Sequence, residues 1–266
     1  MKGLSELDRV LRGDAAPADG RAGPPVALLP LLGADLLLAS FYGVCMGVFA
    51  LAGRAQPEYR QVLADAVKIP LLFLLTLFVT FPSLYVFNAL VGSRLTAGDL
   101  ARLTTAGLGV LVAVLAAFGP IVGFFSVTTT SYPFVLLLNV AVFALAGGFG
   151  LSYLVRTVDH LLPLPAPARP ARARRPDPVP GDEGEAGPVG EPAAPTAAGR
   201  PPTASPAAAR TVLYVWLVVF ALVGAQMSWV LRPFVGAPDL EFTWFRPRES
   251  SFFEAVLRSA RMLFLK

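Results

Sequence analysis

The residues that could do chemistry in this sequence are polar groups set in or beside long apolar runs. Asp35 is the one carboxylate placed next to such a run, and a proton-coupled transporter needs an ionisable group at membrane depth. Asp35 also directly precedes the apolar stretch LLLASFYG, where an aspartate is typical of a helix N-cap. We therefore expect Asp35 to cap the first apolar helix near the membrane interface.

Three amide side chains and the proline at position 82 stand out within the apolar runs. The amides are Asn88, Asn139 and Gln226, and Pro82 lies six residues before the first of them. A proline removes a helix hydrogen bond and bends the helix, while an amide that faces lipid is costly. Together they are compatible with a polar route beside a kinked helix. Amides also bond neighbouring helices together, and the absence of Asp, Glu or Lys beside them in mid-run favours that second role.

Hydroxyl groups are concentrated in the connection SVTTTSY. A re-entrant element of this kind can meet an ion or a polar headgroup. The plainer interpretation is a tight turn, in which hydroxyls satisfy the last carbonyls of one helix and the first amides of the next. Six hydroxyls in seven positions exceed what a turn requires, so the segment is a candidate site. Its members are Ser126, Thr128, Thr129, Thr130, Ser131 and Tyr132.

The inventory of catalytic and metal-binding residues is short. One cysteine, Cys45, and one histidine, His160, are too few for an intrachain disulfide or a Cys/His metal cluster. The sequence has no phosphate-loop motif and no His-Glu-x-x-His motif. We expect a protein that is not an enzyme, with no catalytic residues, no cofactor-binding residues and no metal ligands.

The elements that must position these residues are long apolar runs. Of the 266 residues, 55% are hydrophobic and 15% are charged, whereas a soluble domain carries about 25% charged residues. Five runs reach the roughly 20 residues that cross a bilayer as a helix. They lie at about 34–53, 67–91, 103–125, 132–155 and 211–231. The sequence thus predicts an all-α integral membrane protein with about five transmembrane helices, whose first partner is the lipid bilayer.

Polar segments divide the chain around these runs. We expect a polar N-terminal segment at 1–26, a four-span bundle within 27–156 and a fifth helix within 210–233. Proline, alanine, glycine and arginine dominate residues 162–209, which predicts a disordered loop because little apolar surface can be buried there. Small residues at spacing four, among them Gly43 and Gly47, permit close helix crossings.

The C-terminal tail, residues 234–266, carries a further helix signal. Ser251 and Glu254 have capping-box spacing just before an apolar series with helical periodicity. The pattern predicts an amphipathic helix at 251–265 that lies in the membrane interface or docks on a partner subunit.

Basic residues predict the orientation. Twelve lysines and arginines near the spans lie in the N-terminal segment and in the connections at 92–102 and 156–210, against six at 54–68 and 232–248. The positive-inside rule then places the N-terminus and the loop 162–209 in the cytoplasm. The basic residues are too scattered for a nucleic-acid-binding stripe, so no nucleic acid is expected as a partner.

Three blocks of the sequence are similar to a known group. They are AVKIPLLFLLTLFVTFPSLYVFNALVGSRL (66–95), FFSVTTTSYPFVLLLNVAVFALAG (124–147) and LRPFVGAPDLEFTWFRPRESSFFEAV (231–256). Over about half of the chain they resemble a family of uncharacterised bacterial multi-pass membrane proteins, which has no known activity to carry over. The resemblance implies a shared structural role for Lys68, Pro82, Asn88, Arg232 and Pro233. The Ala/Pro/Arg-rich composition fits a bacterial genome of high GC content, and so predicts the bacterial cytoplasmic membrane.

Two functional hypotheses remain open from the sequence. The first is a non-enzymatic membrane subunit that scaffolds or anchors a larger assembly with protein partners in the membrane, since recognisable catalytic chemistry is absent and the loop and tail are suited to tethering. The second is a permease or channel component for a small or lipidic solute that depends on a separate energy source. It rests on Pro82, the three amides and the hydroxyl turn.

Overall fold

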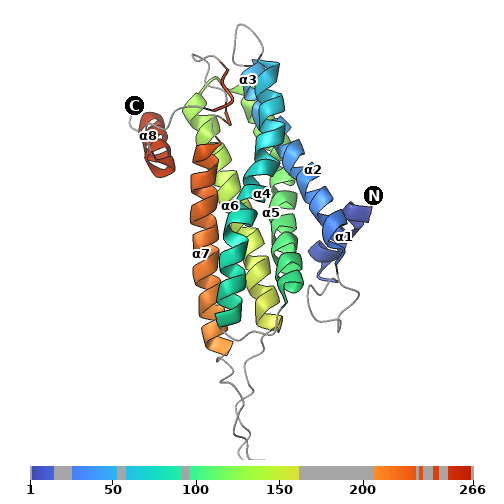
Figure 1. The fold of residues 1–266 in the computed structure, drawn as a ribbon. Helices are drawn as coiled ribbons and strands as arrows, with labels where there is room; N and C mark the ends of the chain where they lie inside the picture. The colour runs from blue at the N-terminus through green and yellow to red at the C-terminus, as the bar shows by residue number, and fades with distance from the viewer. Residues whose placement is uncertain are drawn as a thin grey trace, which may run out of the picture.

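The helices of this protein form one elongated bundle (Figure 1). A computed structural model describes residues 2–14, 26–52, 58–90, 96–161, 206–231, 234–235, 242–245 and 251–264, and every regular element in these ranges is an α-helix. The bundle helices are α2 (Leu28–Gly47), α4 (Tyr59–Leu90), α5 (Ala97–Thr128), α6 (Tyr132–Leu161) and α7 (Pro206–Val230). Shorter helices flank them: α1 (Lys2–Arg12), α3 (Phe49–Ala52) and α8 (Phe252–Phe264).

Within the described ranges, four helices are long and apolar enough to cross a membrane. They are Leu28–Ala52, Tyr59–Phe87, Ala97–Thr128 and Tyr132–Thr157, and the described apolar part of α7, Tyr214–Val230, is shorter. Successive bundle helices run in opposite directions, as chain alternation across a bilayer requires (Figure 1). The prediction of an all-α multi-pass membrane protein is confirmed.

Local capping explains where several helices begin and end. Thr96 and Asp99 form a capping box at the start of α5, because the Thr96 hydroxyl accepts from the Asp99 N–H and the Asp99 carboxylate accepts from the Thr96 N–H. The helix α1 stops at Gly13, whose φ of 78° allows the Asp14 N–H to bond the Arg9 carbonyl. The predicted C-terminal helix is confirmed as α8, and the Ser251 hydroxyl accepts from the Glu254 N–H at its start.

The first two spans begin earlier than the apolar runs indicate. The stretch VALLPLLG feeds directly into α2, which starts at Leu28 instead of about 34, and α4 starts at Tyr59 instead of about 67. The N-terminal segment is also more than a polar tail, because α1 packs Leu7 and Val10 into the bundle. The early turns of α4 carry polar side chains that other segments bury.

Some sequence predictions fall on residues outside the described ranges. Residues 162–205 of the loop predicted at 162–209 lie outside the described ranges. The last residues of that predicted loop, from Pro206, belong to α7. The Arg232–Pro233 pair and the side chain of Asn88 also lie outside the described part of the protein.

Close packing of α2 on α4 organises the half of the bundle next to α3. A Cβ atom at Gly43 would collide with the Asp65 carbonyl oxygen, and one at Gly47 would lie 2.8 Å from the Val62 Cα. Glycine at both positions therefore lets the two backbones touch, as the spacing-four pattern predicts. The result is that side chains of α4 reach directly onto the surface of α2.

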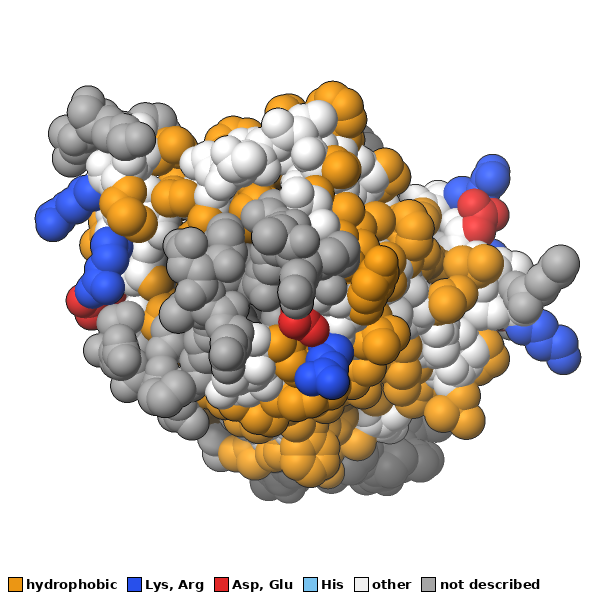
Figure 2. All heavy atoms as spheres, turned by 90° about the horizontal axis from the view of Figure 1, so that it is seen from above, with side chains coloured by type: hydrophobic (Ala, Val, Ile, Leu, Met, Phe, Trp, Pro, Cys, Tyr) orange, Lys and Arg blue, Asp and Glu red, His pale blue; other side chains and the backbone are white. Residues whose placement is uncertain are grey.

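Charged side chains are few on the α3 end of the bundle and lie in small groups. Seen from the α3 end, hydrophobic side chains are spread over the described surface, and charged groups lie over α8 on the left, over α1 on the right and near the centre of the view (Figure 2). This distribution fits a bundle surrounded by lipid with polar helices at its flanks.

Candidate functional site

Asp35 lies inside the bundle, and the predicted N-cap role is wrong. Ala27 occupies the N-cap position of α2 and makes no side-chain capping bond. Asp35 is the eighth residue of the helix, about 10 Å from its first residue. The cap prediction failed because the helix includes the lead-in that was placed outside it.

The Asp35 carboxylate is buried without a partner. Its side chain is 1% exposed, and neither carboxylate oxygen has a hydrogen-bond partner among the residues that the structure describes. A Cβ atom at Gly109 of α5 would lie 3.0 Å from Asp35 Oδ1 and 2.9 Å from a methyl group of Leu7. Asp35 thus occupies a space between α2 and α5 that the missing side chain of Gly109 leaves open and that α1 covers.

A second buried carboxylate, Asp65, lies where α4 crosses α2. Its side chain is fully buried, its Oδ1 accepts from Gln61 Nε2 at 2.8 Å, and its Oδ2 has no partner in the described ranges. A Cβ atom at Gly47 would lie 3.0 Å from that Oδ2 atom. Sequence reasoning missed Asp65 because it started the second span at residue 67. The usable signal was the helical spacing of Gln61, Asp65 and Lys68 on one face.

Lys68 completes this cluster one turn further along α4. Its side chain is 2% exposed and interacts electrostatically with Asp65. Its ammonium group lies 6.0 Å from the ring centre of Trp244 and 5.6 Å from that of Phe245, within the range of cation–π attraction. Gln61 also donates to the Phe234 carbonyl at 3.2 Å. Segments that follow α7 in the sequence therefore cover the polar face of α4.

Asn139 fulfils the helix-bonding role predicted for the amides. Its Oδ1 accepts from the Tyr42 hydroxyl of α2 at 2.8 Å, and its Nδ2 donates to the Val135 carbonyl of its own helix. Gln226 lies on the exposed side of α7 instead. These two amides therefore do not converge on one cavity.

The buried polar groups form a row along α2. Asp35, Ala39, Tyr42 and Met46 lie on one buried stripe of that helix, and the backbone of Tyr42 is about 10 Å along the axis from that of Asp35. One turn beyond Tyr42, Asp65 lies against the next turns of α2, beside Gly47. The row crosses the apolar part of the bundle without continuous hydrogen bonds in the described structure.

Pro82 lies within α4, which continues through it to Leu90. The nearby Thr80 carbonyl accepts from the Trp216 indole N–H of α7 at 3.1 Å and from the Ser83 hydroxyl at 2.6 Å. A neighbouring helix and a hydroxyl thus supply donors beside the proline, as backbone groups in hydrocarbon require.

The hydroxyl segment is a short turn. Helix α5 runs to Thr128 and α6 starts at Tyr132, so only Thr129, Thr130 and Ser131 connect them. The Thr128 hydroxyl donates to the Phe124 carbonyl, and the Thr129 hydroxyl accepts from the Ser131 N–H. Ser126 is different, because it is fully buried and its hydroxyl has no partner among the described residues.

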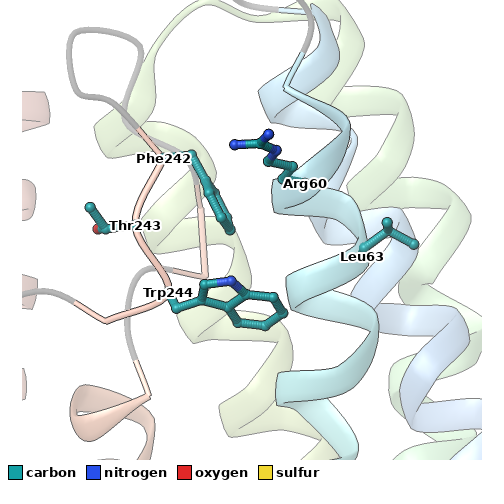
Figure 3. A pocket seen from close by; sticks show the side chains of 5 residues that line it. All are labelled: Arg60, Leu63, Phe242, Thr243 and Trp244. Carbon is teal, nitrogen blue, oxygen red and sulfur yellow. The ribbon is translucent and has the colours of Figure 1, made fainter.

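A pocket of about 410 Å³ opens beside the first turns of α4. Arg60 and Leu63 line it from α4, and Phe242, Thr243 and Trp244 line it from the segment after α7 (Figure 3). The rings of Phe242 and Trp244 face the helix, and the Arg60 guanidinium extends into the space beside Phe242 (Figure 3). The pocket and the cluster of Asp65 and Lys68 therefore share Trp244 as a wall.

The chemistry available to these groups is exchange of protons or binding of a single small cation. In the described ranges, no three His, Cys, Asp or Glu side chains come close enough to hold a metal ion together. A buried carboxylate without a partner carries a large desolvation cost as an anion, so it takes up a proton or attracts a cation.

Comparison with protein-family models, with curated proteins and with solved structures finds no match for this chain. The resemblance of the three sequence blocks to a bacterial membrane-protein family therefore stays a hypothesis.

Proposed function

We propose that the protein is a non-enzymatic permease component that lets protons pass along the buried polar groups of its bundle, as the proton-driven movement of a small solute would require. The observation that carries this proposal is Asp35, a carboxylate buried at depth in the first span with both oxygens unpartnered in the described structure. An ionisable group inside a membrane span marks an ion or proton pathway by default, because its burial is costly.

The row of polar groups along α2 supports a pathway through the bundle. Asp35 lies in the half of the bundle away from α3, and Asp65 lies in the other half, with Tyr42 and Asn139 between them. Carboxylates are proton carriers, and a hydroxyl that is already hydrogen-bonded can pass a proton on. At the end of this row next to α3, the rings of Trp244 and Phe245 lie over Lys68.

Proton flux into proteoliposomes tests this proposal. The purified full chain is reconstituted into vesicles that contain a pH-sensitive dye, and a potassium diffusion potential drives protons inward. We expect the wild-type protein to acidify the vesicles faster than protein-free vesicles do. Asp35→Asn, which keeps the shape and removes the titratable proton, should return the rate to that of protein-free vesicles.

Matched variants distinguish the loss of a pathway residue from the loss of a negative charge elsewhere in the protein. Asp8→Asn removes a carboxylate that is exposed on α1 and pairs with Arg12, so it should keep the wild-type rate. Asp65→Asn should lower the rate, since it removes the second carrier. A wild-type rate equal to that of protein-free vesicles, or an undiminished rate in Asp35→Asn, overturns the proposal.

A second candidate function, a subunit that anchors a membrane assembly, is favoured by Gln226. This amide lies on an exposed face of α7 with Val215, Val218 and Leu222. An amide that faces a partner helix is satisfied by a hydrogen bond, whereas one that faces lipid is not. A photo-crosslinking residue at position 226 should then label a protein partner in native membranes, while one at Val218 on the same face should do so less. Labelling of lipid alone at 226 speaks against this function.

We also propose the orientation and the membrane. The twelve-to-six distribution of basic residues supports a cytoplasmic N-terminus and a cytoplasmic 162–209 segment. The Ala/Pro/Arg-rich composition is typical of bacteria with GC-rich genomes, which supports the bacterial cytoplasmic membrane. Alkaline phosphatase fused after residue 185 should be inactive in a bacterial host, and the same enzyme fused after residue 245 should be active. The reverse pattern contradicts the orientation.

A further inference from the structure

The pocket beside α4 has one cationic wall. Arg60 is exposed and makes no hydrogen bond or ion pair with any residue that the structure describes. Its guanidinium extends into the pocket from α4, toward the segment that carries Phe242 (Figure 3). The planar donors of arginine match the geometry of phosphate oxygens, so this wall is suited to a phosphate-bearing ligand.

The remaining walls of the pocket are mostly apolar, and they include aromatic residues of the types found at the membrane–water interface. Phe242 and Trp244 place their rings opposite Leu63 (Figure 3). Tryptophan and other aromatic side chains concentrate at the level of lipid headgroups, where one part of the ring meets water and another meets hydrocarbon. The pocket lies at the start of a membrane-spanning helix, which is the same level.

An apolar stripe leads from the pocket along the outside of α4. Leu63, Val67 and Phe78 follow Arg60 at spacings of three, seven and eighteen residues, which keeps them on one helix face. Their side chains are 66%, 57% and 78% exposed, so the stripe faces the surrounding lipid. A cation at the end of such a stripe can hold a headgroup while an acyl chain follows the stripe.

We propose that this pocket binds an anionic phospholipid, with its phosphate on Arg60, its headgroup against Phe242 and Trp244, and an acyl chain along Leu63, Val67 and Phe78. An anionic lipid is favoured over a zwitterionic one because the guanidinium makes no ion pair with a carboxylate in the described structure. The apolar stripe distinguishes a lipid from a soluble phosphate compound.

Native mass spectrometry of the full chain in mild detergent tests the site. Phosphatidylglycerol and phosphatidylcholine with the same acyl chains are titrated onto the wild-type protein and its variants. We expect tighter binding of phosphatidylglycerol, and a loss of about fivefold in its affinity in Arg60→Gln, the effect of one interfacial charge contact. Trp244→Leu should weaken the binding of both lipids.

Controls make the result specific to this pocket. Arg258→Gln removes a charge that is exposed and pairs with Glu254 on α8, so it should leave lipid binding unchanged. If Arg60→Gln does not fold, Arg60→Lys keeps the charge and loses the planar donors, and should bind with intermediate affinity. The inference is independent of the proton pathway, so Asp35→Asn should bind phosphatidylglycerol as the wild type does.

Three outcomes overturn the inference. The first is equal affinity of the wild-type protein for the two lipids, and the second is undiminished phosphatidylglycerol binding in Arg60→Gln. The third is displacement of phosphatidylglycerol by inorganic phosphate at comparable concentration, which would show that the site recognises a free phosphate group and makes no use of the acyl chain.

Discussion

The hydroxyl of Tyr42 donates to the carboxamide oxygen of Asn139 at 2.8 Å and so joins α2 to α6 in the middle of the bundle. Both side chains are buried, and Asn139 completes its bonding through the Val135 carbonyl. Nothing in the hydrophobic pattern of either span shows that these two positions meet, 97 residues apart in the sequence. The pair fixes the rotation of both helices and separates the two buried carboxylates.

Breaking this pair should destabilise the bundle modestly. Asn139→Ala and Tyr42→Phe should each lower the free energy of unfolding by about 1 kcal/mol, since each leaves one buried polar group unsatisfied. The double variant should cost less than the two single losses added together. Unfolding in mixed micelles of increasing SDS content measures all three, and full additivity would show that the hydrogen bond contributes nothing.

The contact of α2 with α4 should tolerate no side chain at Gly47. Gly47→Leu forces the backbones apart at Val62 and should lower the free energy of unfolding by roughly 1–3 kcal/mol. Gly148→Leu is the matched control, because a Cβ atom at Gly148 meets no atom within 4 Å. The same unfolding assay should show no loss for the control. Equal losses in the two variants would contradict the packing described for α2 and α4.

The indole N–H of Trp216 should stabilise α4 beside Pro82. Trp216→Phe keeps an aromatic ring and removes the donor to the Thr80 carbonyl, so it should cost about 1 kcal/mol. Tyr214→Phe on the same helix removes a polar atom from a side chain that is half exposed, and should leave the stability unchanged. Thermal unfolding in one lipid composition compares them. A Trp216→Phe protein as stable as the wild type would show that the bond is dispensable.

Asp35 should be dispensable for folding. Neither carboxylate oxygen of Asp35 has a partner in the described ranges. Asp35→Asn and Asp35→Leu therefore leave no buried cation and no hydrogen-bond donor of another residue without its partner. Both variants should keep the wild-type free energy of unfolding or raise it, so a loss of proton flux in them reports on function. A loss of stability above about 2 kcal/mol would indicate that the carboxylate has a structural partner.

The sequence predicted the helices better than it predicted their buried polar groups. The apolar runs indicated the spans, and the Ser251–Glu254 spacing indicated α8, because these signals are local. Asp35 was misplaced since the start of α2 has no side-chain cap to mark it. The cluster of Gln61, Asp65 and Lys68 was missed because its burial depends on residues that follow α7, at the other end of the chain.

The proposed proton pathway requires that Asp35 gains and loses a proton within the membrane. Infrared difference spectroscopy of the protein in bilayers, recorded as the buffer pH is changed, reads the carboxylic-acid C=O stretch of such a group directly. We predict a band in this region that titrates in the wild type and in Asp8→Asn and that loses the contribution of Asp35 in Asp35→Asn, where the buried carboxylate of Asp65 remains. Wild-type and Asp35→Asn spectra that coincide over the whole pH range would show that Asp35 does not titrate, and would contradict the proposed proton pathway.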